Sequence, residues 1–185
     1  MVAGAATVPA VIVGVMLQGS AESAFRSTRL VAINLVVVAI VMLAAEAYAK
    51  RYKHQEQLKQ VSIKQGLAIG VAQAAAIVPG VSRSGATITT GLFMGVERVA
   101  ATRFSFLLGI PITIGALAKV LLSEDTAMQV SGDPWIFVVG ILTALASGLF
   151  AIRFLLKYLA GHTLAVFAYY RIALGIIVLL IGIMT

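Results

Sequence analysis

The sequence predicts an all-α, polytopic integral membrane protein folded as a bundle of helices. Of its 185 residues, 61% are hydrophobic and only 11% are charged, whereas a soluble domain carries about a quarter charged residues. So few charges cannot cover a water-facing surface, and the surplus apolar side chains must therefore face lipid. Cysteine is absent, which excludes disulfides and thiolate chemistry for these residues.

Apolar stretches separated by short polar connectors divide the chain. Because a helix rises 1.5 Å per residue, about 20 residues cross the hydrocarbon core. Four or five stretches therefore qualify as spans, the first being marginal, and residues 1–185 are expected to form a single membrane domain. The stretches are Val2–Leu17, Leu30–Tyr48, Gln65–Val96, Val99–Leu122, Trp135–Leu156 and Leu164–Met184.

The stretch Gln65–Val96 is expected to be a re-entrant hairpin, in which two half-length helices flank a polar turn. Pro79 disfavours helix at the residue before it, and Gly80 and Gly85 permit backbone angles that other residues avoid. Non-helical backbone at membrane depth is tolerated only where protein or water satisfies its polar groups. The alternative is a single kinked span.

The distribution of Lys and Arg supports the hairpin. The connector over residues 50–64 carries five Lys and Arg residues, whereas the turn over residues 123–134 carries none and has three acidic residues. The positive-inside rule then places the N-terminus and the basic connector in the cytoplasm, and the acidic turn and the C-terminus outside. This topology requires residues 65–96 to enter and leave on the same side.

The polar turn, Pro79–Thr87, has the sequence PGVSRSGAT. Placing Arg83 at the centre of a bilayer costs about 2.5–3.5 kcal/mol, so it is a candidate functional residue, and its planar guanidinium suits phosphate oxygens. Ser82, Ser84 and Thr87 add hydroxyls, one of which could act as a nucleophile beside a base. The helix that follows begins with free N–H groups that favour an anion. The turn predicts a phosphate cradle; the alternative is an arginine–carboxylate pair that holds the bundle together.

The string VPGVSRSGATIT, residues 78–89, resembles the PGxSRSG signature of bacterial undecaprenyl-diphosphate phosphatases, the bacitracin-resistance family. The strings VPAVIVGV, LAAE, ATRFSFLLGIPITIGA and FAYYRIALG also resemble this family. The resemblance implies inverted repeats whose re-entrant hairpins meet near mid-bilayer. It further implies hydrolysis of undecaprenyl diphosphate to undecaprenyl phosphate and phosphate, in recycling the cell-wall lipid carrier at the bacterial plasma membrane.

The resemblance also implies roles for particular residues. Arg83 would hold the diphosphate and act in catalysis together with Ser82 and Ser84. From the residues themselves, Gln73 could bind substrate or instead join two helices. Arg171 could reach the diphosphate or instead extend to the membrane interface. The expected substrate-binding set is Arg83, Ser82, Ser84, Gly85, Thr87, Gln73 and Arg171.

The sequence departs from the family pattern in one respect. The family's first repeat carries an ExxxE motif and a PVSSTGH-like loop, and neither string is present here. Gln73 and Ile77 stand where the repeat pattern would place two glutamates. The chain is therefore expected to be the C-terminal portion of the family. The resemblance implies Mg²⁺ or Ca²⁺, with its main ligands absent from this chain, and no metal ligand is assigned. His54 and His162 are expected to be ordinary solvated histidines.

The expected partners are the lipid substrate and the bilayer, and a homodimer is one possible assembly. Nucleic acid is not expected despite the net charge of +7, because the basic residues lie at the ends of apolar segments. Two other functions stay open from the sequence: a transporter or flippase module for a polyprenyl phosphate or another anion, and a catalytically inactive fragment.

Overall fold

The computed structural model describes residues 2–17, 27–51, 60–121 and 134–184. Within these residues all seven regular elements are helices and there are no strands, which confirms the all-α class. The helices are α1 (Val2–Leu17), α3 (Thr28–Arg51), α4 (Ile63–Ala75), α5 (Arg83–Phe93), α6 (Arg98–Leu121), α8 (Pro134–Gly161) and α9 (Ala165–Met184).

Four helices are long and apolar enough to cross a membrane. They comprise Thr28–Arg51, Arg98–Ala118, Pro134–Gly161 and Ala165–Gly182. The first apolar helix is shorter, in agreement with its marginal length in the sequence. Large apolar side chains lie exposed along these helices, including Trp135 and Phe150 of α8. Such a surface requires lipid around it, so the protein is a multi-pass membrane protein.

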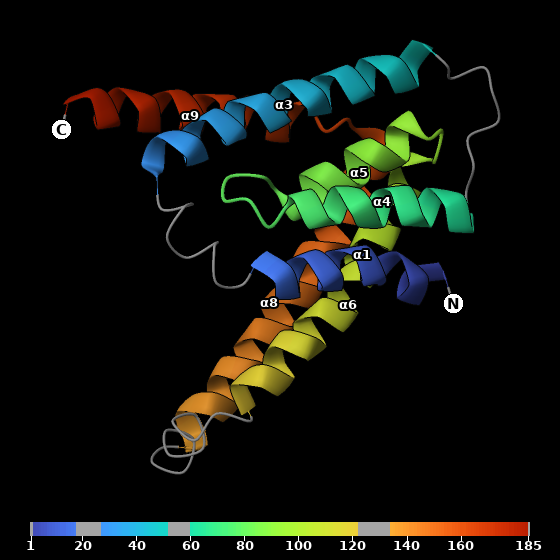
Figure 1. Ribbon diagram of the computed structural model, residues 1–185, viewed down its shortest axis with the longest axis vertical. Helices are drawn as coiled ribbons and strands as arrows, with labels where there is room; N and C mark the ends of the chain where they lie inside the picture. The colour runs from blue at the N-terminus through green and yellow to red at the C-terminus, as the bar shows by residue number, and fades with distance from the viewer. Residues whose placement is uncertain (1, 18–26, 52–59, 122–133, 185) are drawn as a thin grey trace.

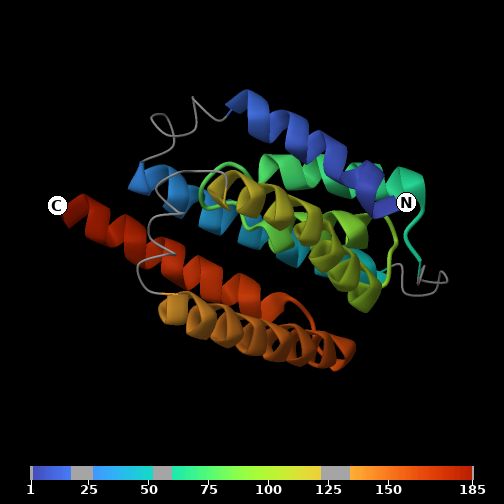
Figure 2. The same cartoon turned by 90° about the horizontal axis from the view of Figure 1, so that it is seen from below.

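The helices pack around the central pair α4 and α5. Helix α3 lies along α9 and also contacts α5, while α1 contacts α4 and α6. Figure 1 shows α6 and α8 extending together away from the α3–α9 pair. Figure 2 shows α4 and α5 in the middle of the molecule, with α1 on one side and α8 and α9 on the other.

Helices α4 and α5 form the hairpin that the sequence predicts. They contain 13 and 11 residues, or about 20 and 16 Å of helix, against a hydrocarbon core of about 30 Å. Gln65, at the start of α4, donates from Nε2 to the carbonyl oxygen of Met94 at 3.1 Å. The open ends of both helices therefore lie together, as in a helical hairpin and unlike a single kinked span. That the hairpin enters and leaves the membrane on the same side stays a prediction.

A buried ion pair fixes the open end of the hairpin. The side chain of Glu46 is 5% exposed, and its carboxylate accepts bonds from Nε and Nη2 of Arg98 at 2.8 and 2.6 Å. The same carboxylate accepts the backbone N–H of Leu164 at 2.8 Å. A single acid thus joins α3, the start of α6 and the segment before α9, and full hydrogen bonding is what makes a buried charge tolerable.

Candidate functional site

Two distant side chains hold the tip of the hairpin. Asn34 of α3 donates from Nδ2 to the carbonyl oxygen of Pro79 at 2.8 Å. Arg171 of α9 donates from Nη2 to the carbonyl oxygen of Gly80 at 2.7 Å. Gly80 has a φ of 86°, and a Cβ there would lie 2.5 Å from the carbonyl oxygen of Val31. Only glycine fits this approach, and the loop carbonyls are satisfied by protein, as membrane depth requires.

The turn ends in a capped helix start. Ser82 is the N-cap of α5, and its Oγ accepts the N–H of Gly85 at 3.1 Å. Its carbonyl oxygen accepts the N–H of Ala86 at 2.8 Å. Among the residues that the structure describes, the N–H groups of Arg83 and Ser84 have no partner. These two donors, at the positive end of α5, are available to an anion.

The Arg83 side chain extends across α6 and is exposed. A Cβ on Gly109 would lie 3.3 Å from Nη2 and 3.6 Å from Cζ of Arg83, so the guanidinium lies directly over this glycine. Sequence reasoning gave Gly109 no part in the site; its one signal is a small residue within a long apolar span. Within the described ranges no carboxylate pairs with Arg83. The alternative interpretation, in which Arg83 holds the bundle together through a carboxylate, requires such a pair.

Arg83 borders two cavities. The larger, of about 530 Å³, lies between α1, α4 and α6, and the polar side chains among its described lining residues are Arg83 and Gln73. Its other walls are apolar, with Val11, Ile77 and Ile112 among them. The smaller, of about 300 Å³, runs along α6, where Arg83 faces Phe106, Gly109, Ile110, Thr113 and Ile114. One cation therefore lies in otherwise mostly apolar surroundings.

Gln73 is the second polar residue of the larger cavity. It is 3% exposed, and within the described residues neither Nε2 nor Oε1 has a hydrogen-bond partner. Leaving a buried amide unpaired costs about 1–3 kcal/mol. The interhelical hydrogen bond, which was the alternative for this residue, is not formed. Its amide is uncommitted beside Arg83.

The other sequence-predicted residues do not line either cavity. Thr87 is fully buried, and its hydroxyl bonds the carbonyl oxygen of Arg83 at 2.9 Å and Oγ of Ser105 at 2.7 Å. Gly85 is buried beneath Ser82, and Arg171 is bonded to the hairpin tip. The structure thus brings together Arg83 and Gln73. The substrate contacts and catalytic roles of all the sequence-predicted residues stay predictions.

The residues around Arg83 do not fit a metal ion. Mg²⁺ and Ca²⁺ favour carboxylate oxygens, and none of the described residues that line either cavity carries a carboxylate or an imidazole. Over residues 2–17, 27–51, 60–121 and 134–184, no group of three or more His, Asp or Glu residues could hold a metal. His162 lies at the other end of α5, and His54 is outside the described residues. The described residues around Arg83 therefore do not supply a metal-binding set.

Comparison with known proteins identifies the family of this chain. The family described as bacitracin resistance protein BacA matches residues 1–177. The chain is 43% identical over 175 residues to an undecaprenyl-diphosphatase of Rubrobacter xylanophilus, and 40% identical over 174 residues to one of Gemmatimonas aurantiaca. Each match covers 94% of this chain and 63% of the relative.

A third relative is matched over nearly its whole length. An undecaprenyl-diphosphatase of Methanothermobacter thermautotrophicus is 41% identical over 173 residues, covering 94% of both chains. The chain thus spans just under two thirds of the length of the first two relatives and nearly all of the third. It belongs to the bacitracin resistance protein family.

Proposed function

We propose that this chain binds undecaprenyl diphosphate and hydrolyses it to undecaprenyl phosphate and inorganic phosphate. One observation carries the proposal: Arg83, without a carboxylate partner in the described residues, lines a largely apolar cavity of about 530 Å³ together with the unpaired Gln73. The relatives named undecaprenyl-diphosphatase, about 40% identical to this chain, support the choice of substrate.

The shape of the site suits an amphiphile with an anionic head. The guanidinium and the two free N–H groups at the start of α5 would bind phosphoryl oxygens, since charge-assisted bonds to phosphate are strong. The amide of Gln73 would hydrogen-bond the bridging region of the headgroup. The apolar walls from α1, α4 and α6 would receive the first isoprene units, and the rest of the chain would extend into the bilayer.

The reaction is the cleavage of one phosphoanhydride bond. The attacking oxygen forms a new P–O bond to the terminal phosphorus and gives up its proton to solvent. If the oxygen is that of water, inorganic phosphate forms directly; if it is a hydroxyl of Ser82 or Ser84, a phosphoserine forms, and water then cleaves it to release phosphate and restore the serine. The bridging P–O bond breaks, and undecaprenyl phosphate leaves with the electron pair. Arg83 would stabilise the charge spread over the equatorial oxygens. Ser82 and Ser84 would orient the phosphate.

The proposal extends to location and assembly. The protein would act in the bacterial plasma membrane, returning the carrier lipid to cell-wall synthesis and thereby contributing to bacitracin resistance. A homodimer stays a prediction that light scattering on the purified protein measures. Mg²⁺ or Ca²⁺ would have to be held largely by groups other than the residues around Arg83, so the assay supplies each ion separately.

The test is release of phosphate from undecaprenyl diphosphate by the purified protein in detergent micelles. Arg83→Ala is expected to lower the rate by about 10²–10³-fold, the typical loss when one charge-stabilising donor is removed. Arg83→Lys should retain part of the activity, because an ammonium keeps the charge but loses the bidentate fork. Arg103 is an exposed arginine near the start of α6 and lines neither cavity. Arg103→Ala therefore serves as the matched control.

Two outcomes would overturn the proposal. Equal rates for Arg83→Ala and the unaltered protein would show that the guanidinium takes no part. Binding of the lipid diphosphate without phosphate release, lost in Arg83→Ala, would favour the transport module or the inactive fragment. This second result has a structural basis, because no described carboxylate or imidazole lines the cavities to act as a general base.

A further inference from the structure

A third pocket, of about 300 Å³, lies at the opposite end of α5 from Arg83. The ten residue-to-residue steps from Arg83 to Phe93 place the two ends of α5 about 15 Å apart along the helix. Unlike the cavities at Arg83, this pocket is lined by several polar side chains. The chief ones are Lys50 of α3, Glu97 and Arg98 at the start of α6, and His162 and Thr163 after α8.

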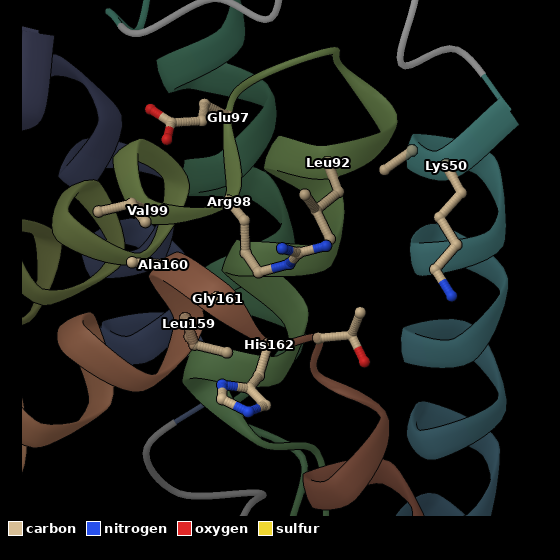
Figure 3. A pocket seen from close by; sticks show the side chains of 11 residues that line it. Lys50, Leu92, Glu97, Arg98, Val99, Leu159, Ala160, Gly161 and His162 are labelled. Carbon is tan, nitrogen blue, oxygen red and sulfur yellow. The ribbon is translucent and has the colours of Figure 1, made fainter.

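Donors from three parts of the fold converge on this pocket. Figure 3 shows the Arg98 guanidinium and the His162 ring beside the same space, with Lys50 extending along its α3 side. The carboxylate of Glu97 points away from the Arg98 guanidinium in this view. Within the described residues no carboxylate pairs with Lys50. Glu46 offsets the charge of Arg98, so Lys50 is the lining cation that has no carboxylate partner among the described residues.

The donors are held in place before any ligand arrives. The Glu46 carboxylate engages two of the five N–H groups of the Arg98 guanidinium, fixing its plane and leaving the others for a ligand. The His162 ring stacks on Tyr158 with centroids 4.3 Å apart and planes at 8°. Its Nδ1 lies 3.1 Å from the Tyr158 carbonyl oxygen, and among the described atoms Nε2 has no partner.

The position of the pocket at the ends of the membrane-spanning helices indicates which ligand it could bind. It lies where the membrane-spanning helices α3 and α8 end and α6 begins, which is the depth of lipid headgroups. The Lys and Arg distribution predicts that this end faces the cytoplasm, where the leaflet is anionic, and basic pockets between spanning helices bind anionic headgroups there. Apolar side chains such as Phe154 lie exposed along α8, offering a path for acyl chains.

We propose that this pocket binds the phosphate of an anionic phospholipid headgroup from the cytoplasmic leaflet. Lys50 and Arg98 bind the phosphate oxygens, and His162 adds a bond from Nε2 when its ring carries both protons, since Nδ1–H faces the Tyr158 carbonyl oxygen. The acyl chains lie against the apolar face of α8. The volume of about 300 Å³ accommodates a phosphate with its glycerol and stands at the small end for ligand sites. The site is separate from the one around Arg83.

Native mass spectrometry of the detergent-purified full chain, titrated with phosphatidylglycerol, tests the proposal. Phosphatidylcholine, which has no net charge, is titrated at the same concentrations as the control for lipid binding that does not depend on the charge of the headgroup. Lys50→Gln is expected to weaken phosphatidylglycerol binding about fivefold, the effect of one basic group near a headgroup. The double variant Lys50→Gln with His162→Gln should lose more of the affinity for phosphatidylglycerol than Lys50→Gln alone. Lys64→Gln, an exposed lysine at the same end outside the pocket, should change the affinity less than twofold.

Three results would overturn the proposal. Equal retention of phosphatidylcholine and phosphatidylglycerol would show that no anionic group is recognised. Equal losses in Lys50→Gln and Lys64→Gln would show that the pocket has no special part. Displacement of phosphatidylglycerol by millimolar inorganic phosphate would assign the site to free phosphate. None of these outcomes depends on hydrolysis at Arg83, so this proposal and the proposed function fail separately.

Discussion

Replacing Gln73 by methionine is expected to stabilise the protein while weakening its substrate binding. Gln73 is 3% exposed, and neither of its amide atoms has a hydrogen-bond partner among the described residues. Methionine has a similar length and no amide to desolvate. Removing an unpaired buried polar group should raise the free energy of unfolding by about 1–3 kcal/mol. For a chain of this size that corresponds to a rise in melting temperature of roughly 2–12 °C.

The same substitution should weaken substrate binding, although it raises stability. If the amide bonds the headgroup, its loss removes one hydrogen bond of about 0.5–1.5 kcal/mol. The apparent affinity for undecaprenyl diphosphate should then fall between about twofold and tenfold. Thermal unfolding in detergent measures the stability, and phosphate release at varied substrate concentration measures the affinity.

Gln65→Met is the matched control on the same helix. Gln65 is 6% exposed, but its amide accepts the N–H of Ser62 at 2.9 Å and donates to Met94 at 3.1 Å. Methionine there leaves buried groups unpaired and should lower the melting temperature. A fall in melting temperature for Gln73→Met as well would refute the reasoning, since it would mean that the Gln73 amide has a partner within the protein.

Three further substitutions test other contacts. Gly80→Ala should cost at least about 1–3 kcal/mol of stability by thermal unfolding, because its φ of 86° and the Val31 carbonyl oxygen exclude a Cβ; unchanged stability would contradict the tip geometry. Glu46→Ala should cost about 3–5 kcal/mol in the same assay, and Glu46→Gln less; equal effects would show that the charge is unimportant. Gly109→Val should displace the Arg83 guanidinium and lower phosphate release with little change in melting temperature; full activity would place the working guanidinium elsewhere.

Much of the fold follows from local patterns in the sequence. The apolar stretches and their lengths predict the four spans and the short first helix, because burial in lipid depends on composition over about 20 residues. Pro79 and Gly80 within an apolar stretch predict the break between α4 and α5. Arg83 stands out as a functional candidate because an intramembrane cation requires a reason.

The details of the site could not be predicted in the same way. The hydrogen bonds from Asn34 to Pro79 and from Arg171 to Gly80 join residues 45 and 91 positions apart. No periodicity or spacing encodes such contacts, and Arg171 consequently had two equally open roles. From the sequence, Gly109 is expected only to allow close helix packing. Its place under the Arg83 guanidinium could not be predicted, because what occupies the space beside a glycine depends on which residues pack there.

The sequence by itself determined a membrane bundle with a polar hairpin carrying Arg83, because hydropathy, proline and charge act over a few neighbouring residues. Only the tertiary structure decided that Gln73 shares a cavity with Arg83 and has no partner there. It also decided that Glu46 joins Arg98 and Leu164, the latter 118 positions away. Whether a polar group is satisfied depends on which distant segments the fold brings within about 3 Å of it, and that distance exists only after the helices pack.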